Sequence, residues 1–257
     1  MKVIYACYGK AGLGCLYRLI SQREIQPEKI LAVTYETDDN ITLTGHLDAL
    51  GIDYVTEPIN SSVTLERMQA FNPDFLFSIY FRDIISADVL SLIKKSAVNL
   101  HPSLLPDYKG CFSAPWVLIN GENLTGITYH IVNTGIDTGN IVLQKELEIK
   151  SWDTGFSLYH RLLSLGVDQF SEMFQKVVRE GFQGIPQKNT GRTYKREIPY
   201  GGYFLLEWGR KRIEDYIRAM FFPPYESAKL IFNNQEYQFA NLTEFEEFCM
   251  RNNISLE

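Results

Sequence analysis

The sequence predicts an α/β protein built on a parallel sheet. In its first part, short apolar runs alternate with stretches whose apolar residues recur every three or four positions. Strands that alternate with helices form parallel sheets with right-handed crossovers. A chain of 257 residues, 45% of them hydrophobic and 13% aromatic, is long enough for one large ordered domain, or for a domain with a small appendage.

The first expected strand and helix meet at a glycine-rich turn. The apolar run from Val3 to Tyr8 is followed by Gly9, Gly12 and Gly14, and a helical repeat of apolar residues then continues to residue 20. These glycines lack the GxGxxG spacing of a dinucleotide-binding turn. We expect them to permit a tight turn from strand to helix.

Further strands and helices are expected before His101. The predicted strands cover residues 30–35, 54–55, 75–80 and 98–100, and the helices between them carry Leu43, Leu47 and Leu50, then Leu65, Met68 and Phe71, then Val89, Leu90 and Ile93. Ser61 or Ser62, and later Ser86, are the expected N-caps. Ligands of parallel sheets bind outside the carboxyl ends of the strands. Asn99, His101 and the segment 78–85 lie at such ends.

The sequence of the second half of the chain predicts a long helix, which is followed by a change in amino-acid composition. Asp153 or Thr154 opens the helix, which runs toward Gly181. A stretch rich in Gly, Pro and mixed charge follows, so we place a boundary near Gly181 between a main domain, 1–180, and an appendage, 181–257. The expected elements of this small α+β appendage are a helix around residues 213–220, two strands around residues 233–234, and a last helix with a capping box formed by Thr243 and Glu246.

Composition excludes several classes of function. The net charge of -6 and the pI near 5.4 disfavour nucleic acid as a partner. No stretch is apolar for long enough to predict a membrane span, and the first residues do not predict a signal peptide. The cysteines are scattered (Cys7, Cys15, Cys111, Cys249). They are expected to be free thiols in a reducing cytoplasm.

A group of polar residues lies at the end of the predicted strand at residues 98–100. Asn99 and His101 stand two positions apart, so on a strand they share one face. Residues 126–132 and 141–147 predict two strands joined by a loop that contains Asp137. That loop is able to bring the Asp137 carboxylate back to the amide and the imidazole.

These residue types suit proton transfer and oxyanion stabilisation. Ser103 is not set in a nucleophile elbow, so its hydroxyl is expected to hydrogen-bond within its own loop. One His and one distant Asp do not form a recognisable metal site. His101 can act as a base toward an amine, and the Asn99 amide can donate to an oxyanion. Asp137 can orient the imidazole, stabilise its cation or help to move the amine proton. Acyl transfer between two bound small molecules fits this set.

Two motifs carry a family resemblance. NLHPSLLPDYKG, followed by GITYHIVNTGIDTGNIV, resembles the folate-dependent formyltransferases over roughly residues 1–180. The resemblance implies a Rossmann-like formyltransferase domain, 10-formyltetrahydrofolate as the donor and no metal. It also implies a catalytic trio of Asn99, His101 and Asp137.

The resemblance further implies a pocket for the pterin of the folate. The residues that would form it are the backbone of Asp83, Ile84 and Ile85 and the loop Asn133, Thr134, Gly135 and Ile136 with Asp137. The chain departs from many relatives at Asp107, where Lys or Arg is common, and at Lys109, where Arg is common. A phosphate contact from this loop therefore stays an open question.

The C-terminal part indicates the acceptor. GRTYKREIPYGGYFLLEW and IRAMFFPPYESAKL resemble the sugar N-formyltransferases, which act on nucleotide-linked amino sugars for O-antigen synthesis. Methionyl-tRNA formyltransferases carry a larger basic barrel there, and the glycinamide ribonucleotide enzymes lack such an appendage. We expect a dTDP-linked amino-dideoxy sugar as the acceptor, with dTDP-4-amino-4,6-dideoxyglucose as the best candidate. The sequence leaves open whether the amine is at carbon 3 or carbon 4, and whether the sugar is gluco or galacto. Candidate contacts to its nucleotide are Arg82, Lys195 and Arg196 for phosphate, and Trp208, Phe222 or Tyr225 for the base.

Two other functions remain open at this point. A formyl hydrolase would release formate from the folate without an acceptor, and an inactive relative would only bind folate or sugar nucleotide. The intact trio argues against the inactive relative. The aromatic tail also predicts pairing of two subunits as a homodimer.

Overall fold

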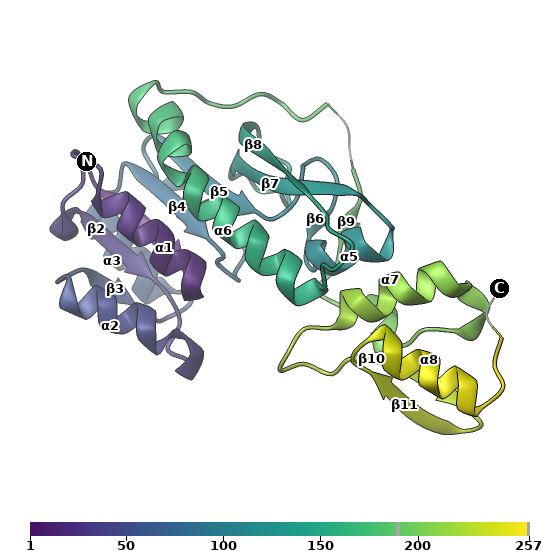
Figure 1. The fold of residues 1–257 in the computed structure, drawn as a ribbon. Helices are drawn as coiled ribbons and strands as arrows, with labels where there is room; N and C mark the ends of the chain where they lie inside the picture. The colour runs from purple at the N-terminus through teal and green to yellow at the C-terminus, as the bar shows by residue number, and fades with distance from the viewer. Residues whose placement is uncertain (189–190, 256–257) are drawn as a thin grey trace. The chain divides into compact units, whose positions relative to one another are not determined.

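The computed structural model describes residues 1–188 and 191–255, and its elements are drawn in Figure 1. The chain forms two compact units, each assembled from three segments. The first consists of Met1–His101, Ile127–Lys145 and Leu163–Thr190, and the second of Pro102–Gly126, Glu146–Leu162 and Gly191–Glu257. The predicted boundary near Gly181 concerns continuous parts of the chain and stays a prediction.

A seven-stranded sheet organises the first unit. Its order is β3-β2-β1-β4-β5-β7-β8. The strands are β1 (Val3–Cys7), β2 (Ile30–Val33), β3 (Asp53–Val55), β4 (Phe75–Ile79), β5 (Ser96–His101), β7 (Leu124–Ile131) and β8 (Ile141–Glu148). The first five strands pair in parallel, as the sequence predicts, whereas β7 pairs with β5 in the antiparallel sense. The sheet is therefore mixed but mostly parallel.

Helices cover both faces of this sheet. They are α1 (Gly9–Ile20), α2 (Ile41–Ala49), α3 (Ser62–Phe71), α4 (Ala87–Ser91) and α6 (Gly155–Phe174), with a π turn at Gln175–Arg179 and 3-10 turns at Pro27–Lys29 and Asp38–Asn40. Helices α1 and α6 lie side by side in Figure 1, and a Cβ on Gly14 would lie 3.0 Å from the Val167 side chain. Gly14 therefore permits this close approach.

The opposite face of the sheet packs on α3 and α4. Ile4 and Leu76 point from the sheet into a buried cluster that includes Met68 of α3 and Val89 of α4. The expected N-caps are present, because the hydroxyl of Ser61 accepts from the Thr64 N–H at 3.2 Å and that of Ser86 from the Val89 N–H at 3.3 Å. Because successive side chains of a strand point to opposite faces, the nearly continuous apolar runs of these strands give a core on both faces.

The second unit is a small α+β assembly with an aromatic core. Its elements are β6 (Lys109–Gly110), α5 (Ser113–Ile119), β9 (Thr193–Tyr194), α7 (Arg210–Met220), β10 (Ala228–Phe232), β11 (Gln235–Phe239) and α8 (Leu242–Arg251), with 3-10 turns at Pro199–Gly202 and Leu206–Trp208. Phe204 contacts Tyr216, Phe239 and Phe245 at ring-centroid distances of 6.1, 5.9 and 5.3 Å. The predicted hairpin around residues 233–234 is β10 and β11, which pair in the antiparallel sense.

The capping box of the last helix lies two residues before the predicted one. The Asn241 side chain accepts from the Glu244 N–H at 3.0 Å, and the Glu244 carboxylate accepts from the Ala240 N–H at 2.8 Å. Glu246 instead forms an ion pair with Arg210. Because both residue pairs have the three-residue spacing, the sequence pattern alone does not select between them.

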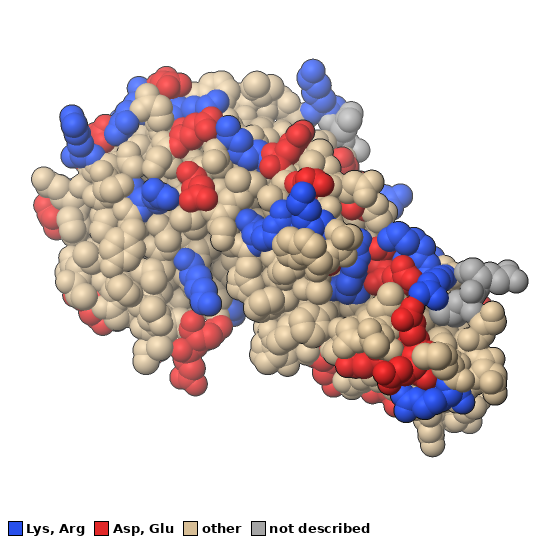
Figure 2. Space-filling view, viewed as in Figure 1, with Lys and Arg blue, Asp and Glu red and all other residues tan. Residues whose placement is uncertain are grey.

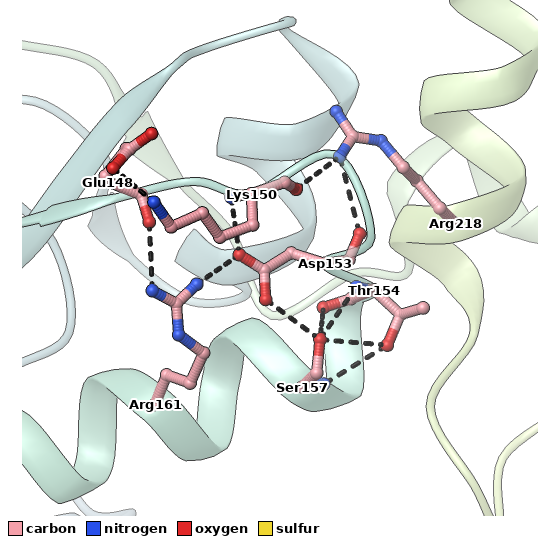
Figure 3. Close-up of polar contacts among 7 residues, drawn as sticks. All are labelled: Glu148, Lys150, Asp153, Thr154, Ser157, Arg161 and Arg218. Carbon is pink, nitrogen blue, oxygen red and sulfur yellow. Dashed lines mark hydrogen bonds and ion pairs between the residues drawn. The ribbon is translucent and has the colours of Figure 1, made fainter.

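A buried carboxylate fixes the start of α6 (Figure 3). The fully buried Asp153 side chain forms an ion pair with Arg161 and accepts from the Lys150 N–H at 2.8 Å and the Ser157 hydroxyl at 3.1 Å. Thr154 caps the helix, since its hydroxyl accepts from the Ser157 N–H at 3.2 Å. The predicted opening of the helix at Asp153 or Thr154 is confirmed.

We expect Asp153→Ala to lower the free energy of unfolding by about 3 kcal/mol, because it leaves the Arg161 guanidinium without its ion-pair partner and the Lys150 N–H unpaired. Urea unfolding measures this loss. Lys150→Ala is the matched control: it removes an exposed ion pair with Glu148 and should change stability by about 0.5 kcal/mol or less. Equal losses in the two variants would contradict the assignment.

Candidate functional site

Antiparallel pairing at the end of β5 assembles the candidate site. The register places Asn99 opposite His130 of β7, and His101 opposite Thr128. Asn99 and His101 share a face of the sheet because they stand two residues apart, and Thr128 and His130 do so for the same reason. Two polar pairs thus lie next to each other on one face. His101 and His130 are almost fully buried, with 4% and 3% of their surfaces exposed.

The loop after β7 brings a carboxylate to both imidazoles. Asp137 Oδ2 lies 3.4 Å from His101 Nδ1, and Asp137 Oδ1 lies 3.3 Å from His130 Nε2. The Asp137 side chain is 15% exposed, and its backbone has φ 51°, a left-handed conformation that aspartate tolerates better than most residues. The structure therefore brings the three predicted residues, Asn99, His101 and Asp137, to one place.

Two features hold this loop in position. The Gln187 side-chain amide donates to the carbonyl oxygens of Asp137 and Gly139, each at 2.8 Å. At Gly139 there is no room for a side chain, since a Cβ would lie 1.7 Å from the Ile131 carbonyl oxygen. The loop that carries the Asp137 carboxylate is therefore held by the hydrogen bonds from Gln187 and by the close packing of Gly139 against the end of β7.

Sequence reasoning missed three residues of the site. The Ser78 hydroxyl donates to Asn99 Oδ1 at 2.7 Å, His130 contacts Asn99 and Asp137, and Gln187 holds the loop. His130 had a signal, because the alternation of Thr128 and His130 in GITYHIV predicts a common face. Gln187 had none, since nothing in its local sequence points to residues 50 positions earlier.

The residues predicted for the pterin lie in two loops of the first unit. Asp83, Ile84 and Ile85 follow β4; Ile84 is 72% exposed, whereas the Ile85 side chain belongs to the core cluster. Asn133, Thr134, Gly135 and Ile136 form the exposed loop after β7, where the Asn133 side chain accepts from the Gly135 N–H at 3.1 Å and the Thr138 hydroxyl at 2.8 Å. Ile84 and Ile136 thus present apolar surface beside ordered backbone, and the pocket stays a prediction.

Arg82 lies in a cluster of aromatic rings at the carboxyl ends of β1, β2 and β4. Its guanidinium is 3.7 Å from the centroid of the Tyr8 ring and 3.8 Å from the Asp39 carboxylate, and its backbone N–H donates to the Tyr35 hydroxyl at 2.9 Å. Burial raises the pKa of Tyr35 to about 12, and the hydrogen bond from Tyr8 lowers the pKa of Asp39. The order of strands reverses between β1 and β4, the position where open α/β sheets bind ligands.

The other candidate nucleotide contacts lie in the second unit. Lys195 and Arg196 are exposed, and Tyr225 is 71% exposed. Trp208 lines a cavity of about 520 Å³ at the start of α7, where the Arg212 guanidinium already lies 4.1 Å from its ring centroid. A base stacked on that face of Trp208 would have to displace Arg212.

Phe222, the last of these candidates, packs inside this unit against Tyr159, with the ring centroids 5.2 Å apart. Lys109, which stands where relatives often carry Arg, is buried in β6 with 4% of its surface exposed. Among residues 1–188 and 191–255, no three His, Cys, Asp or Glu side chains are grouped to bind a metal, and no helix has the length and apolar character of a membrane span.

Comparison with known proteins identifies the family. The sequence model described as formyl transferase matches residues 56–174. A GDP-perosamine N-formyltransferase of Brucella melitensis is 37% identical over 237 residues, which cover 92% of this chain and 91% of the relative.

Two solved structures share the fold. One is WlaRD, a sugar 3N-formyl transferase crystallised in the presence of dTDP and 5-N-formyl-THF; it has a TM-score of 0.76 and 24% identity, covering 93% of this chain and 85% of that one. The other is an N-formyltransferase from Helicobacter canadensis in complex with folinic acid and dTDP-3-aminofucose, with a TM-score of 0.73 and 23% identity, covering 91% of this chain and 85% of that one. This chain therefore belongs to the formyl transferase family, among its sugar N-formyltransferases.

Proposed function

We propose that the protein moves the formyl group of 10-formyltetrahydrofolate to the primary amine of a nucleotide-linked amino-dideoxy sugar. The observation that carries this proposal is the grouping of the Asn99 amide, the His101 imidazole and the Asp137 carboxylate at the end of β5. An amide and an imidazolium can bind an oxyanion, and an imidazole or a carboxylate can take a proton. Formyl transfer to an amine requires both.

In the proposed reaction the sugar amine attacks the formyl carbon of the folate. The carbonyl oxygen becomes an oxyanion, to which Asn99 and protonated His101 donate hydrogen bonds. The amine loses one proton, to Asp137 where His101 is already protonated or to His101 where its ring starts neutral. The oxyanion then re-forms the carbonyl as the bond from carbon to the folate nitrogen breaks, and that nitrogen takes up a proton. Burial of His101 strengthens these electrostatic interactions, because little water competes for them.

The donor is a formylated folate, as for the neighbours crystallised with 5-N-formyl-THF and folinic acid. The loops at 83–85 and 133–137 are the proposed pterin site. Arg82 is the proposed phosphate contact of the first unit, since its guanidinium is already held by Tyr8 and Asp39. Lys195, Arg196, Trp208, Phe222 and Tyr225 stay candidates for the rest of the nucleotide.

The charge distribution favours a small acceptor over RNA. Lys and Arg are interspersed with Asp and Glu over the face drawn in Figure 2, in keeping with the net charge of -6. Binding of RNA draws on a surface of one sign that neutralises many phosphates. We propose a role in surface polysaccharide synthesis such as that of O-antigen; the cytoplasmic location and the homodimer stay predictions.

Two acceptors are to be tested. The sequence predicts dTDP-4-amino-4,6-dideoxyglucose, and the relative from Brucella melitensis favours GDP-perosamine. We expect the purified protein, with 10-formyltetrahydrofolate, to convert one of them to a product heavier by one CO in the mass spectrum. The enzyme without folate is the control. Formate release without a sugar product would instead indicate a hydrolase, and unchanged sugar masses with both would contradict the proposal.

A further inference from the structure

His130 has no part in the reaction proposed above, yet its buried ring contacts two of the three residues that do. Its Nδ1 lies 2.9 Å from the Ile131 carbonyl oxygen. Its Nε2 lies 3.1 Å from Asn99 Nδ2 and 3.3 Å from Asp137 Oδ1. With 3% of its surface exposed, His130 is screened from solvent, so these contacts determine how its ring is oriented.

The partners of the ring assign its hydrogens. A backbone carbonyl oxygen can only accept a hydrogen bond, so Nδ1 of His130 carries hydrogen and donates to Ile131. The second nitrogen, Nε2, is therefore the one that faces Asn99 and Asp137. An imidazole oriented through one nitrogen presents the other with a defined role.

The hydrogen bonds of Asn99 fix the orientation of its amide in the same way. Its Oδ1 accepts from the Ser78 hydroxyl at 2.7 Å, which turns its NH₂ group toward His130 Nε2. One hydrogen of that NH₂ group is engaged by His130, and the other can be offered to an oxyanion. Asp137 is similarly divided, with Oδ2 facing His101 and Oδ1 facing His130.

We infer that His130 is a positioning residue of the formyl-transfer site, acting on Asn99 through Nε2, which accepts a hydrogen bond from the amide; the inference rests on the proposed function. It keeps the Asn99 amide turned toward the oxyanion. Without Nε2, the Asn99 NH₂ group loses its acceptor in the buried interior. Displacements of about 1 Å in such groups cost up to about a hundredfold in rate.

Two variants separate the role of Nε2 from that of the ring. The amide of His130→Gln extends to the position of Nε2, whereas that of His130→Asn extends only to Nδ1, where it still donates to the Ile131 carbonyl. We expect His130→Asn to lower kcat by about thirtyfold with the KM of both substrates within about twofold, as for other residues that orient a reacting group. His130→Gln should stay within about fivefold of the unchanged protein.

Other outcomes overturn the inference. If both variants keep the kcat of the unchanged protein, or both lose it equally, then Nε2 has no special role. Thermal denaturation of both variants shows whether they fold. Failure of the unchanged protein to formylate either sugar nucleotide would count against the proposed function instead, and the spectroscopic test below would still decide the inference.

Nitrogen-15 NMR tests the ring without any substrate. The chain has four histidines, so the His130 signals can be assigned with the His130→Gln variant. We expect hydrogen on Nδ1, and a change in the Nε2 shift when Asn99 is replaced by Ala. A neutral ring with hydrogen on Nε2 alone, or an Nε2 shift that ignores Asn99→Ala, would refute the inference.

Discussion

Alanine at Asn99, His101 or Asp137 lowers kcat by about a hundredfold or more in each case, the usual cost of losing an oxyanion donor or a proton carrier. Asn99→Ala removes the amide that donates to the oxyanion. His101→Ala removes the imidazole, and Asp137→Ala removes the carboxylate 3.4 Å from it. Steady-state rates of sugar formylation with saturating folate measure the three losses.

The control for these variants is Asp168→Ala. Asp168 belongs to the same unit, but its carboxylate is 65% exposed and forms a surface ion pair with Arg18. We expect its kcat to match that of the unchanged protein, since exposed ion pairs contribute little. Near-normal turnover in all three alanine variants would mean that the chemistry lies elsewhere in the molecule.

Gly139→Ala is expected to impair both folding stability and turnover. A Cβ at this position would lie 1.7 Å from the Ile131 carbonyl oxygen and 2.8 Å from the carbonyl carbon, so the backbone itself must move. We expect a loss of about 3 kcal/mol in the free energy of unfolding, at the upper end for overpacking. The loop that carries Asp137 moves with it, and kcat should fall by about tenfold to a hundredfold.

Gly45→Ala provides the comparison for this loss. Gly45 lies within α2, and a Cβ there meets no atom within 4 Å. Alanine should leave kcat unchanged and raise stability by up to about 1 kcal/mol, because it favours the helix. If both glycine variants were equally stable in urea, steric exclusion at Gly139 would be disproved.

Much of the first unit could be predicted because its signals are local. Apolar runs bounded by turns give β1 through β5, and Ser61 and Ser86 precede the helices that they cap. Asn99 and His101 were found because a strand places alternate residues on one face. The carboxyl end of β5 then identified the edge of the sheet at which they lie.

The rest depends on contacts between distant segments. Periodicity does not give the direction of a strand, so the antiparallel pairing of β7 with β5, and with it His130 beside Asn99, was not predicted. Gln187 reaches Asp137 from the segment after α6, which local patterns do not encode. The cap of α8 is a different failure, since Asn241 and Thr243 both satisfy the same rule and only the fold chooses Asn241.

The pairing of β5 with β7 also indicates where this chain can change in length. The side chains of a strand alternate between its faces, so one residue inserted into β7 upstream of His130 would turn either that imidazole or its partners away from the Asn99 face. The connection from Pro102 to Asn123 imposes no such parity, because it joins β5 to β7 outside their ladder. Insertions and deletions that accumulate in descendants of this gene should therefore spare residues 124–131 and fall in the turns of that connection, outside β6 and α5.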